Sequence, residues 1–172
     1  MGEEQGRVLK VTVVQGKRLA VRDYFKSSDP YVILKLGNQV AKTKVINSCL
    51  NPVWNEEFTF SLAEPAGVLT LEVFDKDRFK ADDKMGRAHL SLQPIASAAR
   101  LRKILGASSS SSSGETVLRK VVPDNDNCLV GESEIKCVEG DEVEQSVWLR
   151  LTAVESGDIL LKLRLFDSPV RC

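Results

Sequence analysis

Hydrophobic and polar residues alternate along most of the chain with the period of two that is typical of half-buried β-strands. In VLKVTVVQG, Leu9, Val11 and Val13 fall on one face, and Lys10 and Thr12 fall on the other. Further short runs, separated by Gly, Asn or Pro, lie at residues 31–37, 41–46, 56–62, 68–74 and 87–92. Short strands at such regular spacing favour an antiparallel β-sandwich over alternating strands and helices. The pattern therefore predicts an all-β fold.

The pattern changes after residue 92. Apolar residues with the spacing of one helix face stand at Ile95, Ala98, Ala99, Leu101 and Leu105. Because a glycine follows them, they predict a short amphipathic helix with a defined end. Six serines at 108–113 predict a surface loop of low complexity. Four more strand-like runs follow at 116–122, 133–138, 146–154 and 158–166.

Length and charge limit the class of protein. The 172 residues suffice for one domain with its own core. The 24 basic residues are balanced by 24 acidic residues, so we expect no specific nucleic-acid binding. We find no signal-peptide pattern and no apolar run of membrane-spanning length, and therefore expect a soluble intracellular protein. The four cysteines lack metal-site spacing and are expected to be free thiols.

Two clusters of aspartates are the most informative feature of the chain. Asp23 and Asp29 directly precede one strand-like run, and Asp75, Asp77 and Asp83 follow another. Calcium takes six to eight oxygen ligands at about 2.3–2.6 Å, and two acidic loops at strand ends could supply most of them. Aspartates also favour turns, so each cluster alone has a simpler explanation. Together the clusters predict a calcium site with a position open to an outside ligand.

Aromatic and basic residues stand among these acids. Tyr24 and Phe25 lie between the first pair of aspartates, and Phe79 lies between Asp77 and Asp83. The neighbouring basic residues are Lys26, Arg78 and Lys80. This combination suits insertion at the headgroup boundary of an anionic membrane. Alternatively, the aromatic rings fold back beneath their loops and serve as core anchors.

Other kinds of site find little support in the sequence. The single histidine, His89, lies in a strand pattern without a nucleophile motif nearby, so neither a Ser-His-Asp nor a Cys-His arrangement is expected. No phosphate-binding glycine motif is present. The sequence therefore does not indicate an enzyme.

Three stretches in register resemble a C2 domain over residues 7–92. They are the SDPYV step at 28–32, the NPVWNEEFTF stretch at 51–60 and the DxDxxxxxD pattern at 75–83. The resemblance implies an eight-stranded C2 β-sandwich of type II topology, with the last strand expected at a sheet edge. It also implies calcium ligands, namely the side chains of Asp23, Asp29, Asp75, Asp77 and Asp83 and the backbone carbonyls of Arg22 and Lys76.

The C2 resemblance gives a second basic feature a possible role. Lys35, Lys42 and Lys44 alternate outward on two neighbouring predicted strands. Many C2 domains bind phosphoinositides with lysines at such positions. A solvated strand face that discourages edge pairing explains the same three residues equally well.

The remainder of the chain resembles one plant family. The expected C2 core covers residues 7–92 and 146–168 of a single domain, and TVLRKVVPDNDNCLVGESEI lies in the surplus at 93–145. This insertion is similar to that of the C2-domain abscisic-acid-related proteins, also called small GTPase-activating C2 proteins. A calcium-dependent adaptor is implied, which binds anionic phospholipid and brings PYR/PYL abscisic-acid receptors to the plasma membrane. The alternative is a regulator that stimulates a YchF-type G protein, with Arg100, Arg102 and Arg119 available as an arginine finger. We expect the protein in the cytoplasm and, with calcium, at the plasma membrane; its size is also compatible with the nucleus.

Overall fold

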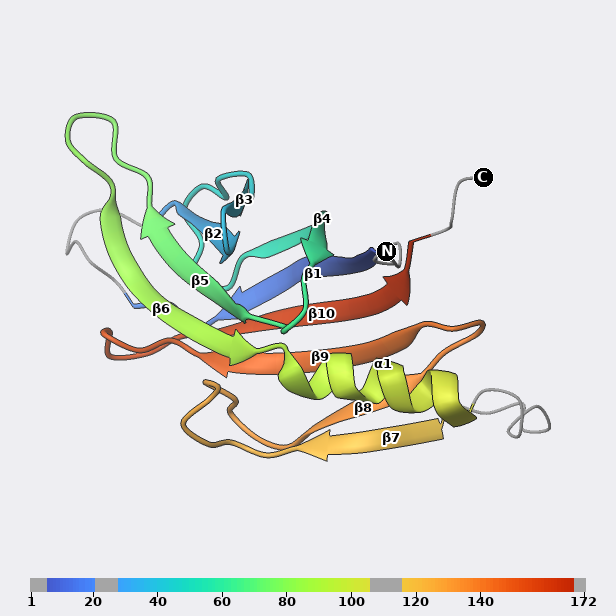
Figure 1. Cartoon of the computed structure of the whole chain (residues 1–172). Coiled ribbons are helices and arrows are strands. Elements are labelled where there is room, and N and C mark those ends of the chain that lie inside the picture. The colour runs from blue at the N-terminus through green and yellow to red at the C-terminus, as the bar shows by residue number, and fades with distance from the viewer. Residues whose placement is uncertain (1–5, 21–27, 106–115, 169–172) are drawn as a thin grey trace.

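The computed structural model describes residues 6–20, 28–105 and 116–168, which form two facing antiparallel sheets and a helix (Figure 1). The larger sheet has the order β4-β1-β10-β9-β8-β7, with β1 (Arg7–Lys17), β4 (Val53–Leu62), β7 (Thr116–Val121), β8 (Ser133–Cys137), β9 (Val143–Arg150) and β10 (Asp158–Asp167). The smaller has the order β3-β2-β5-β6, with β2 (Pro30–Leu36), β3 (Gln39–Lys42), β5 (Val68–Asp75) and β6 (Asp83–Ser91). The helix α1 spans Gln93–Leu105.

The predicted alternation places one face of each strand in a shared core. Leu9, Val11 and Val13 of β1 have no exposed surface, while the residues between them are half-buried. On the opposite sheet, Val32 and Leu34 of β2 are equally buried. Burial of alternate apolar side chains between the sheets is the main force that holds such a sandwich together.

The surplus segment extends one sheet and covers the extension. Strands β7 and β8 pair with each other, and β8 continues the larger sheet beyond β9. The smaller sheet has only four strands, and helix α1 contacts β7, β8 and β9 beside it (Figure 1). Ile95, Ala96 and Ala98 of α1 are buried there. The predicted helix and additional strands are confirmed, and the other eight strands form the expected sandwich.

The expected edge position of the last strand is wrong. Strand β10 lies between β1 and β9 and pairs with both, and the edges of its sheet are β4 and β7. Ile159, Leu161, Leu163 and Leu165 have no exposed surface. A strand this apolar is more stable with both backbone edges hydrogen-bonded than with one edge in water. The low polarity of DILLKLRLF is thus explained by its central place.

One end of the sandwich carries the strand ends that border the predicted calcium loops. Strand β1 ends and β2 begins there, and the β5–β6 connection at 76–82 rises from the same end (Figure 1). The β8–β9 turn at 138–142 lies at the opposite end. Within the described segments, no helix has the length and hydrophobicity needed to cross a bilayer.

Candidate calcium and membrane site

The pairing of β2, β5 and β6 brings acids from both predicted clusters together. Asp75 is the register partner of Pro30 on one side and of Asp83 on the other. The backbone N–H of Asp29 donates to Oδ1 of Asp75 at 2.8 Å, and the N–H of Lys76 donates to the carbonyl of Asp29 at 3.0 Å. Two segments separated by 46 residues are therefore joined where β2 begins and β5 ends.

Electrostatics show the effect of this crowding on Asp75. Desolvation by burial raises the pKa of its carboxyl, and the hydrogen bond from the Asp29 backbone opposes that rise. The nearby charges of Asp29, Asp83 and Asp77 raise the pKa further. A cation bound among these acids would favour the ionised form of Asp75.

The loop between β5 and β6 is organised by two carboxylates. Oδ1 of Asp77 accepts hydrogen bonds from the backbone N–H groups of Phe79 at 2.9 Å and Lys80 at 3.3 Å. Oδ1 of Asp82 accepts from the N–H of Asp77 at 2.9 Å, and its other oxygen accepts from the hydroxyl of Tyr31. The loop's fold is thus held by its own acids and by one residue of β2.

Asp82 and Asp83 are adjacent but occupy different environments. The backbone N–H of Asp77, then the Tyr31 hydroxyl, lower the pKa of Asp82, and Lys76 lies 3.8 Å from its carboxylate. Burial and the bond to Asp82 raise the pKa of Tyr31 to about 12. Asp83 instead stands opposite Asp75, with Lys80 Nζ at 3.8 Å from its carboxylate. Asp83 is therefore the member of the pair that faces the other acids.

The chemistry of these donors fits calcium. The side chains of Asp29, Asp75, Asp77 and Asp83 and the carbonyl of Lys76 all offer hard oxygens. Lys80 Nζ lies 4.0 Å from Asp77 and 3.8 Å from Asp83, so a cationic group already sits beside the acids. In the described part of the chain, no three acidic, His or Cys side chains are grouped closely enough to hold a metal by themselves. A complete calcium shell would need Asp23 and Arg22, which lie outside the described residues.

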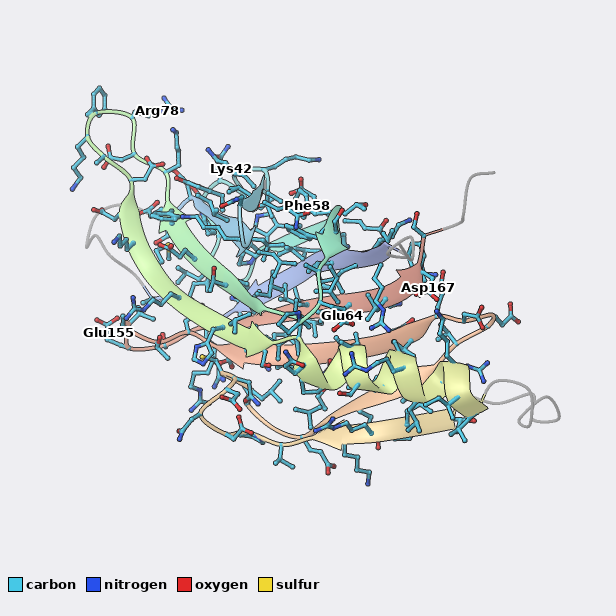
Figure 2. The ribbon with its side chains drawn as sticks, in the orientation of Figure 1. Lys42, Phe58, Glu64, Arg78, Glu155 and Asp167 are labelled. Atoms are coloured by element: carbon cyan, nitrogen blue, oxygen red, sulfur yellow. The ribbon has the colours of Figure 1, made fainter. Side chains whose placement is uncertain are left out.

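The loop at 76–82 presents an aromatic ring and two cations to solvent. Phe79 is 89% exposed, so its ring is not folded beneath the loop. Arg78 and Lys80 are exposed beside it, and Figure 2 shows Arg78 at the tip, away from both sheets. The other predicted membrane residues, Tyr24, Phe25 and Lys26, lie outside the described residues.

The predicted lysine face lies on the smaller sheet. Lys35 pairs with Val40 and Lys42 pairs with Ile33 across β2 and β3. Lys35 Nζ is 4.0 Å from Glu72, and Lys42 Nζ lies 4.5 Å from the centroid of the Tyr31 ring. Lys44 follows β3 and is exposed. Lys42 lies on the edge strand β3, which fits the edge-protecting interpretation, and lipid binding by the three lysines stays a prediction.

Two contacts were missed by sequence reasoning. One is the bond from Tyr31 to Asp82, which joins residues 51 positions apart. The other is a Cys-His pair, since Sγ of Cys128 lies 3.2 Å from Nδ1 of His89. The expectation that no such pair exists was wrong, because its members are 39 residues apart and meet only where residues 126–130 cross β6. No local spacing could have revealed either contact.

Comparison with known proteins identifies the family. The C2 domain family profile matches residues 7–105, more than half of the chain. "Protein C2-DOMAIN ABA-RELATED 11" of Arabidopsis thaliana is 68% identical over 98% of this chain and 98% of its own length. The chain is a C2-domain protein of the C2-domain ABA-related family.

Two further proteins are similar to this C2 protein, one in sequence and one in fold. "GTPase activating protein 1" of Oryza sativa subsp. indica is 48% identical over 94% of this C2 protein and 93% of its own length. Among solved structures, the calcium-bound pair of C2 domains of Extended-Synaptotagmin 2 aligns with a TM-score of 0.63 at 22% identity. That alignment covers 97% of this chain and 48% of the other chain, and it shows the shared C2 fold.

Proposed function

We propose that this C2 protein is a calcium-dependent adaptor that binds anionic phospholipid with the loops at the acidic end of the sandwich. The observation that carries the proposal is the position of Phe79, fully presented to solvent on a loop whose base holds Asp75, Asp77 and Asp83. Bound calcium would supply positive charge between these acids and an anionic headgroup. Arg78 and Lys80 would add attraction of about 1 kcal/mol each near the membrane surface.

Co-sedimentation with phosphatidylserine vesicles, in calcium or chelator, tests the proposal. Wild type should pellet only with calcium, and Asp75→Asn/Asp77→Asn should stay in the supernatant. The matched control is Glu139→Gln/Asp141→Asn, which removes the same charge from exposed positions in the β8–β9 turn at the opposite end. Equal pelleting in chelator would transfer the binding to the face of Lys35, Lys42 and Lys44. No pelleting in either condition would refute the lipid proposal.

The partner proposed for the insertion is an abscisic-acid receptor of the PYR/PYL type, which would be brought to the plasma membrane. The name of the Arabidopsis relative supports a link to abscisic acid. Exposed apolar residues lie in the last turns of α1 and on β7, which α1 contacts (Figure 1), namely Leu101, Ile104, Leu105 and Val117. A sandwich that only binds lipid does not need this surface.

Ile104 is the sharpest probe of the partner surface, because it is 81% exposed. Ile104→Ser should abolish capture of the receptor on vesicles while leaving calcium-dependent vesicle binding unchanged. Val68→Ser is a matched control, since Val68 is an exposed apolar residue on β5 outside the insertion. Receptor capture that survives Ile104→Ser would exclude this surface.

A second candidate function is stimulation of GTP hydrolysis by a G protein, which the name of the rice relative supports. We propose a G protein of the YchF type as the target. Of the three candidate fingers, Arg100 is bound to Glu64 and Arg102 donates to the carbonyl of Gly140. Arg119 is exposed on edge strand β7. If this function holds, Arg119→Ala should lower stimulated GTP hydrolysis by about 10³-fold or more, and Arg100→Ala should not. Hydrolysis unaffected by Arg119→Ala would remove this residue as the finger.

A further inference from the structure

Cys128 and His89 form a side-chain pair that the calcium and membrane site does not use. His89 lies on β6, and Cys128 lies in the connection between β7 and β8. Sγ of Cys128 is 3.2 Å from Nδ1 of His89, and both side chains are partly exposed. A thiol this close to an imidazole has a proton acceptor at hand.

Backbone hydrogen bonds hold the two residues next to each other. The N–H of Cys128 donates to the carbonyl of His89 at 3.0 Å, and its carbonyl accepts from Arg150 at 2.8 Å. On either side, Asn127 bridges to Leu90 of β6 and Leu129 bridges to Leu149 of β9. The segment that carries Cys128 is thus hydrogen-bonded to one strand of each sheet. The fold therefore keeps Cys128 and His89 side by side.

The second nitrogen of His89 settles which way a proton can move. Nε2 lies 3.3 Å from the carbonyl oxygen of Asn125. A carbonyl only accepts hydrogen bonds, so this contact favours the tautomer that carries its proton on Nε2. Nδ1 therefore either accepts from the thiol of Cys128 or holds the proton of a thiolate. In both cases one proton is shared between Sγ of Cys128 and Nδ1 of His89.

We propose that Cys128, assisted by His89, is a modification site for small disulfides such as glutathione disulfide. His89 takes the thiol proton, and the Cys128 thiolate attacks one sulfur of the disulfide. A new S–S bond to Cys128 forms while the original S–S bond breaks. The leaving thiolate receives the proton from His89 and departs as a free thiol. The protein thiol is oxidised and the small disulfide is reduced, so no other oxidant is needed.

The chain contains its own reference thiols. Cys49 and Cys137 are also free and partly exposed, and the chain has no second histidine to assist them. The rate of mixed-disulfide formation with glutathione disulfide can be followed at each cysteine by peptide mass spectrometry. Each rate is divided by the rate of the same cysteine in the urea-unfolded chain, which removes the effect of local sequence.

Near neutral pH, Cys128 should react about tenfold faster than Cys49 and Cys137 on this scale, a modest value for general-base assistance. His89→Gln should lower the Cys128 rate to that of the other two, with circular dichroism confirming the fold. A Cys128 rate no higher than the reference rates, or an advantage that survives His89→Gln, would overturn the proposal.

Discussion

At the residue scale, two adjacent aspartates, Asp82 and Asp83, have different roles in one loop. Asp82 bonds to the Asp77 backbone and to the hydroxyl of Tyr31, whereas Asp83 stands opposite Asp75. Asp82 therefore shapes the loop that presents the acids, and Asp83 belongs to the acids that face one another. The resemblance of the DxDxxxxxD pattern to a C2 domain implies Asp83 as the ligand, and the contacts of Asp82 give a physical reason why the two residues differ in role.

The contribution of the Tyr31 hydroxyl to the loop can be tested by removing it with a single substitution. Tyr31→Phe should lower the free energy of unfolding by about 1 kcal/mol, since Asp82 loses a hydrogen bond in a partly buried setting. For a chain of this size the Tm should fall by about 2–4 °C. Calcium affinity should also weaken, because the loop loses its tie to β2. Calorimetric unfolding and calcium titration measure the two effects.

The control for this deletion is Thr70→Val, which removes an exposed hydroxyl from the neighbouring strand β5. That change should leave both Tm and calcium affinity near the wild-type values. A Tyr31→Phe protein as stable as Thr70→Val, with unchanged calcium affinity, would show that the Tyr31–Asp82 bond does not support the loop.

The raised pKa of Asp75 predicts that stability depends on pH in the absence of calcium. Its folded-state pKa is raised by burial and by the neighbouring acids, so the folded state binds the proton more readily than the unfolded state. The ionised carboxyl is destabilising, and stability is therefore lost as the pH rises through the carboxyl range near about 4. Asp75→Asn keeps an oxygen for the Asp29 N–H and removes the charge.

In chelator at neutral pH, Asp75→Asn should consequently unfold at a higher temperature than wild type. The advantage should shrink as the pH falls below the carboxyl range, where the wild-type residue is protonated. Thermal unfolding across a pH series measures both effects, with Asp141→Asn as a control at an exposed position. An Asp75→Asn protein that is less stable than wild type at neutral pH in chelator would contradict the electrostatic account.

At the element scale, β6 depends on one glycine where its pairing with β5 shifts register. Gly86 has a φ of 117°, and an added Cβ would lie 2.7 Å from Cγ1 of Val154 and 2.8 Å from Cβ of Leu151. These neighbours precede β10. Because Gly86 has no side chain, β6 of the smaller sheet can pack closely against the connection between β9 and β10 of the larger sheet.

Gly86→Ala should therefore destabilise the protein by about 3 kcal/mol, since it combines overpacking with a backbone conformation that alanine rarely adopts. Chemical denaturation measures the free energy of unfolding. Gly131→Ala is the control, because a Cβ at Gly131 would meet no atom within 4 Å. Equal stability of the two variants would mean that the neighbours of Gly86 yield without cost.

At the scale of the whole molecule, the sandwich separates the 76–82 loop from the proposed partner surface at the end of α1. The 76–82 loop and the end of α1 point toward different ends of the fold (Figure 1). In Figure 2, Arg78 marks the first end, and Asp167 lies on the side where α1 ends. Lys103 of α1 bonds to Asp167 at 2.5 Å, which ties the helix to β10. The proposed adaptor function uses this separation, because a membrane and a partner protein would then bind at different ends.

Calcium should stabilise the whole fold by linkage. A ligand at a hundredfold excess over its Kd adds about 2.7 kcal/mol, which corresponds to a rise in Tm of roughly 5–10 °C here. Asp75→Asn/Asp77→Asn should show no rise, and magnesium should act more weakly because it gives up its waters reluctantly. Scanning calorimetry in chelator, calcium and magnesium makes the comparison. A wild-type Tm that calcium leaves unchanged would argue against the calcium site.

The amino-acid sequence by itself determined the strands, the helix and the presence of two acidic loops, because each of these depends on local periodicity or spacing. The alternation of Leu9, Val11 and Val13 required a half-buried strand wherever that strand lay. The tertiary structure alone decided that β10 is central, that Tyr31 reaches Asp82 and that Cys128 meets His89. Those contacts join residues 39 to 51 positions apart, or depend on the order of strands in a sheet, and only the packing of the two sheets brings them together.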